Sequence, residues 1–223
     1  MTNNIHYSNL PPVVVIGSGG HARVLIDCLQ LACREILFCT EIASDLYGQT
    51  IDGILIKGPD ELILDLDMGK VHLANGMGSI GEPIRREEVY ERFSKQGFTF
   101  TSVVHPSATV AKSVKISDGV QIMANAVAQP GAVIGSNTII NTAATIDHDS
   151  QIGAHCHIAP RVAVSGQVVV GRRSHIGTGA SVIQAVHIGA GCVVGAGATV
   201  VKNLPDGTFA VGTPAKPIHP KKS

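Results

Sequence analysis

His148 stands between two carboxylates in a part of the chain that is otherwise almost free of charge. Asp147 precedes it, Asp149 follows it, and residues 119–146 contain no Asp, Glu, Lys or Arg. An imidazole held by a neighbouring carboxylate has a fixed tautomer and a raised basicity, which suits it to accept a proton in catalysis. A histidine in a repeated structure is also commonly a hydrogen-bonding corner residue, and that alternative stays open. His148 with Asp149 is therefore the first candidate for general-base chemistry.

A second candidate site is the glycine-rich segment Gly17-Ser18-Gly19-Gly20-His21-Ala22. It follows directly on the apolar run 13–16 and precedes residues 23–32, which have the apolar spacing of a helix. A glycine turn between a strand and a helix lets backbone N–H groups approach a phosphate. Glu41, some twenty residues further on, is either the acidic ribose partner of a dinucleotide site or a solvated loop carboxylate. The segment that surrounds this turn, about the first 100 residues, is long enough for only one mononucleotide-binding half of a dinucleotide-binding fold. Its size therefore favours a single nucleotide diphosphate as the ligand over a dinucleotide.

The composition excludes several classes of function. Charged residues make up 15% of the chain, and 17 basic residues balance 17 acidic ones, so no overall field attracts nucleic acid or anionic lipid. Residues 119–146 and 174–201 are each 28 residues long and uncharged, but Gly, Asn, Gln, Thr and Ser interrupt both. Neither run has the roughly 20 predominantly apolar residues of a membrane span. We therefore predict a protein without nucleic-acid or membrane binding.

The cysteines and the start of the chain indicate a cytoplasmic protein. The cysteines are odd in number and lack CxxC spacing, which predicts small buried thiols in a reducing compartment. They are Cys28, Cys33, Cys39, Cys156 and Cys192. The first twelve residues have no basic stretch followed by an apolar one, so no signal peptide is expected.

A period of six residues explains the uncharged runs. Every sixth residue from Val104 to Val200 is Val or Ile, with Ala128 as the exception, and the residue four places further on is small or aliphatic. A helix cannot use this period, whereas short strands joined by equivalent corners can. The pattern predicts a parallel β-helix of triangular section with 18 residues to a coil and about 5.7 coils.

The predicted fold is therefore α/β plus all-β in three parts. Residues 1–102 form a small Rossmann-like unit, 103–205 form the β-helix, and 206–223 form a carboxy-terminal segment. Within the first part, strands are expected at 13–16, 36–39, 71–74 and 98–103, and helices at 23–32 and 83–96.

The 18-residue coil predicts which distant residues are neighbours. Gly166 follows His148 by 18 residues and should lie on the same edge about 5 Å away. His157 is half a coil from His148 and should lie on another side, with His175 one coil beyond it as a structural residue.

Two segments together carry a resemblance to a known family: the Gly17–Ala22 turn and Ala-Val-Gly-Thr-Pro-Ala-Lys at 210–216. The chain resembles the sugar O-acyltransferase family that includes sialic acid O-acetyltransferase, a branch of the hexapeptide-repeat acyltransferases. Within it, the chain is most similar to N-acetyltransferases of UDP- or GDP-linked 4-amino sugars. The resemblance implies a left-handed β-helix and a homotrimer with active sites between subunits. It also implies acetyl-CoA along the prism and a nucleotide-linked amino sugar in the amino-terminal unit.

The resemblance also assigns roles to residues. Residues 140–149 match the catalytic stretch, so that His148 is the general base, Asp149 raises its basicity and Asn141 contacts the sugar. The glycine equivalent to Gly166 gives its N–H to the thioester oxyanion. Residues implied at acetyl-CoA are His157, Gly166, Thr178, Ala196 and Lys216. Residues implied at the nucleotide sugar are Gly19, Gly20, His21 and Gly76, to which the position of Glu41 adds a further candidate.

The expected reaction is direct acetyl transfer to the C4 amine, without an acyl-enzyme. Cys156 and Cys192 fall at core-facing corners, which are poor places for a nucleophile. O-acetylation of sialic acid or a related hydroxyl, and a β-helical binding or scaffold protein without chemistry, remain alternatives. A zinc site like that of β-helical carbonic anhydrases is not expected, because their histidine pattern is not reproduced. The sequence leaves open the nucleotide, the sugar, the pathway and acyl groups other than acetyl.

Overall fold

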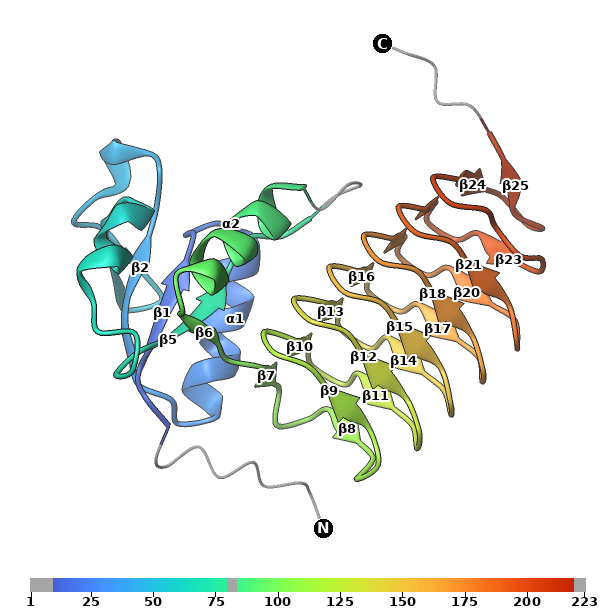
Figure 1. Ribbon diagram of the computed structural model, residues 1–223, viewed down its shortest axis with the longest axis horizontal. Coiled ribbons are helices and arrows are strands. Elements are labelled where there is room, and N and C mark those ends of the chain that lie inside the picture. The colour runs from blue at the N-terminus through green and yellow to red at the C-terminus, as the bar shows by residue number, and fades with distance from the viewer. Residues whose placement is uncertain (1–9, 80–83, 219–223) are drawn as a thin grey trace. The chain divides into compact units, whose positions relative to one another are not determined.

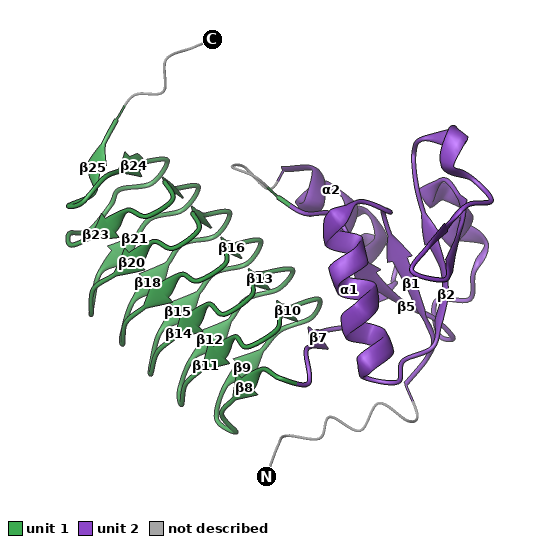
Figure 2. Ribbon diagram, turned by 180° about the vertical axis from the view of Figure 1, so that it is seen from behind, with its two compact units in different colours: residues 1–3, 79–83, 107–223 green, residues 4–78, 84–106 purple. Residues whose placement is uncertain are grey.

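The computed structural model describes residues 10–79 and 84–218, which divide into two compact units (Figure 2). One unit contains residues 10–78 and 84–106, and the other contains Ser79 and residues 107–218. Pro83, where a helix is predicted to begin, lies outside the described residues. So do residues 1–9, which belong to the segment from which no signal peptide is expected. Within the described ranges, no helix has the length and apolar character needed to cross a bilayer.

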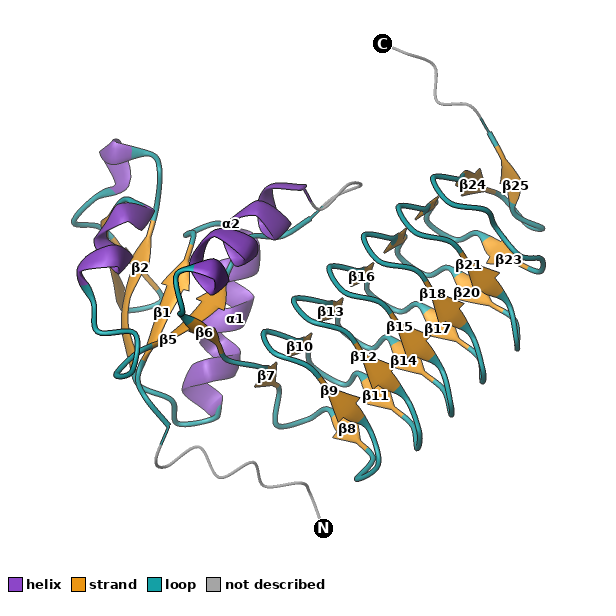
Figure 3. Cartoon of the chain, viewed as in Figure 1, coloured by secondary structure: helices purple, strands orange, loops and turns teal. Residues whose placement is uncertain are grey.

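The amino-terminal unit contains a six-stranded sheet with the order β3-β4-β2-β1-β5-β6. Figure 3 labels β2, β1, β5 and β6 of this sheet. Neighbouring strands run parallel, apart from the antiparallel pair β3 and β4. The strands are β1 Val13–Ile16, β2 Ile36–Thr40, β3 Thr50–Ile51, β4 Ile54–Gly58, β5 His72–Asn75 and β6 Thr99–Phe100, with β7 Val103–Val104 following. The helices are α1 Gly20–Leu31 and α2 Ile84–Lys95, with 3₁₀ turns η1 Ser44–Leu46 and η2 Asp60–Asp65.

The alternation of side chains along β1 places the two helices on opposite faces of this sheet. Val14 and Ile16 belong to the buried cluster that contains Phe93 of α2. Val15 points the other way, toward the side where Ala22 of α1 lies, since a methyl group on Gly76 would meet both Val15 and Ala22. The Rossmann-like unit is thus confirmed, with a parallel sheet covered on both faces.

The β3-β4 hairpin was not among the predicted elements, and α1 begins at Gly20 rather than at residue 23. The hairpin turn is Asp52-Gly53, and both residues have positive φ, at 47° and 82°. An Asp-Gly pair between apolar residues is a strong hairpin signal, and it was present in the sequence.

The second unit is a prism whose three faces are sheets, built mostly from parallel two-residue strands. One sheet has the order β23-β20-β17-β14-β11-β8, the next β21-β18-β15-β12-β9, and the third runs from β10 through β13, β16, β19, β22 and β24 to β25. The strands are β8 Thr109–Val110, β9 Lys115–Ile116, β10 Gln121–Ile122, β11 Val127–Ala128, β12 Val133–Ile134, β13 Ile139–Ile140, β14 Thr145–Ile146, β15 Gln151–Ile152, β16 His157–Ile158, β17 Ala163–Val164, β18 Val169–Val170, β19 His175–Ile176, β20 Ser181–Val182, β21 His187–Ile188, β22 Val193–Val194 and β23 Thr199–Val200.

From β8 to β20, each strand pairs with the strand 18 residues further on, as Ile140 pairs with Ile158 and Ile158 with Ile176. The repeated Val and Ile residues point into the prism, where those from Ile122 to Val200 are buried. The predicted left-handed parallel β-helix is confirmed, and Figure 1 shows its coils stacked in chain order. At the carboxy-terminal end, β24 Phe209–Val211 pairs with β22, and β25 Lys216–Pro217 runs antiparallel to β24.

The cysteines follow the prediction with one exception. Cys28, Cys39, Cys156 and Cys192 are buried, and burial raises the pKa of the Cys156 thiol to about 12. Cys33 is exposed, so the prediction of a buried thiol is wrong there. It lies in the turn after α1 at a φ of 53°, where the chain reverses at the surface.

Candidate active site

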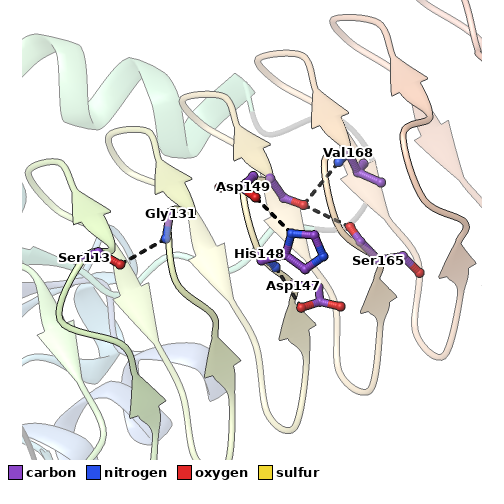
Figure 4. A network of polar contacts seen from close by, with 8 residues as sticks. Ser113, Gly131, Asp147, His148, Asp149, Ser165 and Val168 are labelled. Carbon is purple, nitrogen blue, oxygen red and sulfur yellow. Dashed lines mark hydrogen bonds and ion pairs between the residues drawn. The ribbon is translucent and has the colours of Figure 1, made fainter.

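His148 and Asp149 form a hydrogen-bonded pair at the corner that follows β14. His148 Nδ1 lies 2.9 Å from Asp149 Oδ2, and the backbone N–H of His148 donates to Asp147 Oδ1 over 2.7 Å (Figure 4). The side chains of His148 and Asp149 are 46% and 62% exposed. With Nδ1–H donating to the carboxylate, the neutral ring carries its lone pair on Nε2. The pair therefore presents a basic nitrogen to anything that binds at this edge.

The environment makes this imidazole more basic. The hydrogen bond to Asp149 raises the pKa of His148 most, desolvation opposes it, and the charges of Asp147 and Asp149 raise it further, so that the pKa lies above its ordinary value. A histidine with a raised pKa holds a transferred proton more firmly once it has accepted it.

Gly166 lies against the same ring from the next coil. A methyl group on Gly166 would lie 2.5 Å from Nε2 and 2.6 Å from Cε1 of His148. The N–H groups of its neighbours Ser165 and Gln167 donate to Val182 O and to His148 O. In the part of the chain that the structure describes, the Gly166 N–H has no acceptor. A basic nitrogen and an unused N–H donor therefore lie side by side.

Asn141 and His157 are bound to each other on a different side of the prism. Asn141 Nδ2 lies 3.0 Å from His157 Nε2, and His157 Nδ1 lies 2.7 Å from the carbonyl oxygen of Ser79. The two contacts are satisfied together when the amide donates to Nε2 and Nδ1–H donates to Ser79. His157 is buried, and its ring meets that of His175 edge to face at 5.0 Å. The sequence analysis did not predict the contact between Ser79 and His157. The two residues are 78 positions apart, and Ser79 lies outside the six-residue repeat from which neighbours can be counted.

Thr178 and Ala196 lie in successive coils at the corners that follow β19 and β22, on the same edge of the prism as Asn141. The N–H of Gly197 donates to Thr178 O over 2.9 Å, and the side chains of Thr178 and Ala196 are exposed. Because both side chains are small, they protrude little from the surface of the prism at this corner. Lys216 is exposed on β25, opposite Val211 of β24.

In the other unit, Gly19 and Gly20 leave open space at the start of α1. Gly19 is the N-cap with a φ of −78°, and it makes no side-chain cap. A methyl group on either glycine would meet nothing within 4 Å. Neither crowding nor backbone conformation requires glycine at these two positions. The absence of side chains leaves the backbone N–H groups at the start of α1 accessible to a ligand.

Glu41 holds the glycine loop through Ser18. Its Oε2 accepts hydrogen bonds from the Ser18 hydroxyl over 2.6 Å and from the Ser18 N–H over 3.2 Å, while Oε1 accepts from the Ile42 N–H over 2.8 Å. Desolvation would raise the pKa of Glu41, but these hydrogen bonds outweigh it and lower the pKa below its ordinary value. The carboxylate is thus ionised and fixes the loop conformation.

Gly76 and His21 border the same loop. A methyl group on Gly76 would lie 2.7 Å from the carbonyl oxygen of Ile16, so only glycine allows the chain to pass β1 this closely. His21 packs beside Gly78, where an added methyl group would lie 3.3 Å from the His21 Cβ.

Comparison with known proteins places the chain in a family. The family model for the PglD N-terminal domain matches residues 12–93, and that for the bacterial transferase hexapeptide repeats matches residues 113–148. A mutant of perosamine N-acetyltransferase from Caulobacter crescentus, in complex with CoA and GDP-perosamine, is 36% identical with a TM-score of 0.86. The match covers 94% of this chain and 98% of that one. The chain belongs to the hexapeptide-repeat sugar acetyltransferases.

Two further relatives are an acetyltransferase domain and a succinyltransferase. The acetyltransferase domain of PglB from Neisseria gonorrhoeae FA1090 is 33% identical with a TM-score of 0.86, over 94% of this chain and all of that domain. The 2,3,4,5-tetrahydropyridine-2,6-dicarboxylate N-succinyltransferase of Methylobacterium sp. (strain 4-46) is 36% identical over 76 residues. That match spans a third of this acetyltransferase (34%) and a quarter (25%) of the length of the relative. The protein is an acyltransferase.

Proposed function

We propose that this sugar acetyltransferase transfers the acetyl group of acetyl-CoA to the C4 amine of a nucleotide-linked amino sugar. The arrangement of His148, Asp149 and Gly166 carries the proposal, because it joins a basic nitrogen to an unused N–H donor. The perosamine N-acetyltransferase complex with CoA and GDP-perosamine supports an amine acceptor on a nucleotide. The PglB acetyltransferase domain in complex with acetyl-CoA supports the donor.

In the proposed mechanism the acetyl group passes directly from sulfur to nitrogen. His148 Nε2 removes a proton from the amine as its nitrogen attacks the thioester carbon. The carbon–nitrogen bond forms, and the Gly166 N–H donates to the oxygen that becomes negative. The carbon–sulfur bond then breaks, and the CoA thiolate takes up the proton from His148. General-base assistance of this kind is worth about 10² to 10⁴ in rate.

The other candidate residues are proposed to bind the two substrates. For acetyl-CoA these are His157, Thr178, Ala196 and Lys216. The small side chains of Thr178 and Ala196 leave room for the pantetheine arm along the prism. For the nucleotide sugar they are Gly19, Gly20, His21, Glu41, Gly76 and Asn141. A homotrimer in the cytoplasm, with active sites between subunits, completes the proposal. Such sites would let His148 and His157, on different sides of one prism, act together.

The experiment that tests this function is a thiol-release assay with acetyl-CoA and a panel of acceptors. The panel contains UDP- and GDP-linked 4-amino sugars, the matching 4-hydroxy sugars, and free and CMP-linked sialic acid. Thiol release with the amino sugars alone supports the proposal. Release with the hydroxyl acceptors would instead support the O-acetyltransferase alternative, and binding of acetyl-CoA without release would support a binding protein.

A prediction separates nucleotide binding from stability in the glycine loop. Replacing Gly20 with alanine raises the KM for the nucleotide sugar about tenfold, because the methyl group enters the open space over the start of α1. Alanine favours the helix by up to about 1 kcal/mol over glycine, so the free energy of unfolding does not fall. Steady-state kinetics and thermal denaturation measure the two effects.

The control for this variant is Gly69→Ala. Gly69 also has a φ outside the left-handed region, and it lies in an exposed loop where a methyl group would approach Asp67 Oδ1 to 3.4 Å. We expect KM to stay at the wild-type value there. An unchanged KM in Gly20→Ala as well would contradict phosphate binding at this loop.

A further inference from the structure

Gly131 lies one coil before Asp149 on the edge that carries the candidate base. A methyl group on Gly131 would collide with Asp149 Oδ1 and come within 3.4 Å of its Cγ. The other oxygen of the same carboxylate, Oδ2, accepts the hydrogen bond from His148 Nδ1. The carboxylate therefore reaches His148 by passing over the bare Cα of Gly131.

The backbone conformation does not by itself require glycine at this corner. Gly131 has a φ of 79°, but the equivalent residues of the following coils, Asp149, Gln167 and Ala185, adopt φ values of 60°, 61° and 58°. Side chains are thus accommodated in this conformation on the same edge. Gly179, Gly191 and Gly197, glycines with positive φ at other corners of the prism, have nothing within 4 Å of the place where a side chain would stand.

The backbone around Gly131 is anchored, so a collision is relieved by movement of the carboxylate. The Gly131 N–H donates to the Ser113 hydroxyl over 3.1 Å (Figure 4), and Pro130 O accepts from the Asp149 N–H over 3.1 Å. The Asp149 carboxylate is exposed and turns about two side-chain torsions. Rotation into solvent removes the clash at small cost in stability and breaks the contact with His148.

We propose that Gly131 is a positioning residue of this active site, whose missing side chain leaves the space that the Asp149 carboxylate needs to hold His148. The inference rests on the proposed function, in which His148 is the general base. The charged groups that act on the ring are Asp147 and Asp149 of its own coil. The adjoining coils present the uncharged residues Pro130, Gly131, Gly166 and Gln167 to this edge.

The test compares Gly131→Ala with Gly191→Ala, which carries the same change at a φ of 64° with open space around it. Both variants bear the strain of alanine in the left-handed region, so their thermal stabilities should fall alike. NMR titration of histidine-labelled protein measures the pKa of His148 without reference to turnover. We expect this pKa to drop toward its ordinary value in Gly131→Ala, as in Asp149→Asn, and to stay at the wild-type value in Gly191→Ala.

Turnover gives an independent reading. In Gly131→Ala kcat should fall about 10- to 100-fold, by analogy with the loss of a partner that orients a metal-bound imidazole. In an Asp149→Ala background the same change should cause no further loss, because no carboxylate remains to be displaced. A His148 pKa and kcat equal to those of Gly191→Ala would overturn the inference. Normal turnover in His148→Ala would instead overturn the base role, whatever Gly131 does to the pKa.

Discussion

Replacing His148 with alanine lowers kcat by about 10² to 10⁴ and leaves the affinity for acetyl-CoA nearly unchanged. The ring contributes a proton acceptor that is needed only as the amine attacks, so its loss removes an interaction of the transition state rather than of the bound donor. The exposed corner tolerates the smaller side chain, since the imidazole lies outside the apolar interior of the prism. Steady-state kinetics and acetyl-CoA titration measure the two quantities.

The pH profile provides the control for this prediction. The base must be neutral, so kcat/KM falls as the pH drops through the pKa of His148, which lies above its ordinary value of 6.5. In Asp149→Asn the acidic limb should move to lower pH, because the hydrogen bond that contributes most to the raised pKa is weakened. Near-normal turnover in His148→Ala, or an acidic limb that does not move in Asp149→Asn, would remove this pair from the proposed mechanism.

Adding a single methyl group at Gly166 should lower kcat by about 10², the loss expected when a reacting group is displaced by roughly 1 Å. The methyl group would stand 2.5 Å from His148 Nε2, where the proton from the amine has to arrive. The Gly166 N–H remains in this variant, so the loss reports on displacement of the imidazole. Rate and thermal stability, measured on the same preparation, separate this displacement from unfolding.

The backbone at Gly166 accepts alanine, which keeps the experiment interpretable. Its φ lies outside the left-handed region, and the corresponding corners elsewhere carry Ala190, Ala196 and Thr178. Gly191→Ala, with open space around the added methyl group, serves as the comparison and should retain full turnover. A Gly166→Ala enzyme that turns over as fast as this comparison would show that the contact with Nε2 plays no part in the reaction.

The period of six residues made most of the carboxy-terminal fold predictable. Because each coil repeats after 18 residues, the neighbours of a residue can be counted, which is how Gly166 was predicted to lie beside His148. The amino-terminal unit has no such period. Its parallel strands and helices were predicted from apolar runs, while the β3-β4 hairpin was overlooked despite its Asp-Gly turn.

Contacts that depend on side-chain torsions or on chain connection could not be predicted. Counting places Gly131 next to Asp149, but no spacing says that the carboxylate turns over that glycine to reach His148. Glu41 was a candidate ribose partner, and only the structure shows its carboxylate bound to Ser18. The contact of His157 with Ser79 depends on a distant loop, about which the repeat carries no information.

The stacking of identical coils also determines how the prism opens. A coil touches only the coils before and after it, so local unfolding begins at an end and spreads inward by nearest-neighbour steps. The coil with His148 has strands from β8 to β12 on one side and from β16 to β25 on the other. Local unfolding that begins at either end must pass through several coils before it reaches His148. Amide hydrogen exchange should therefore be slowest around β14 and β17, so the most persistent part of the stack is the part that carries the chemistry.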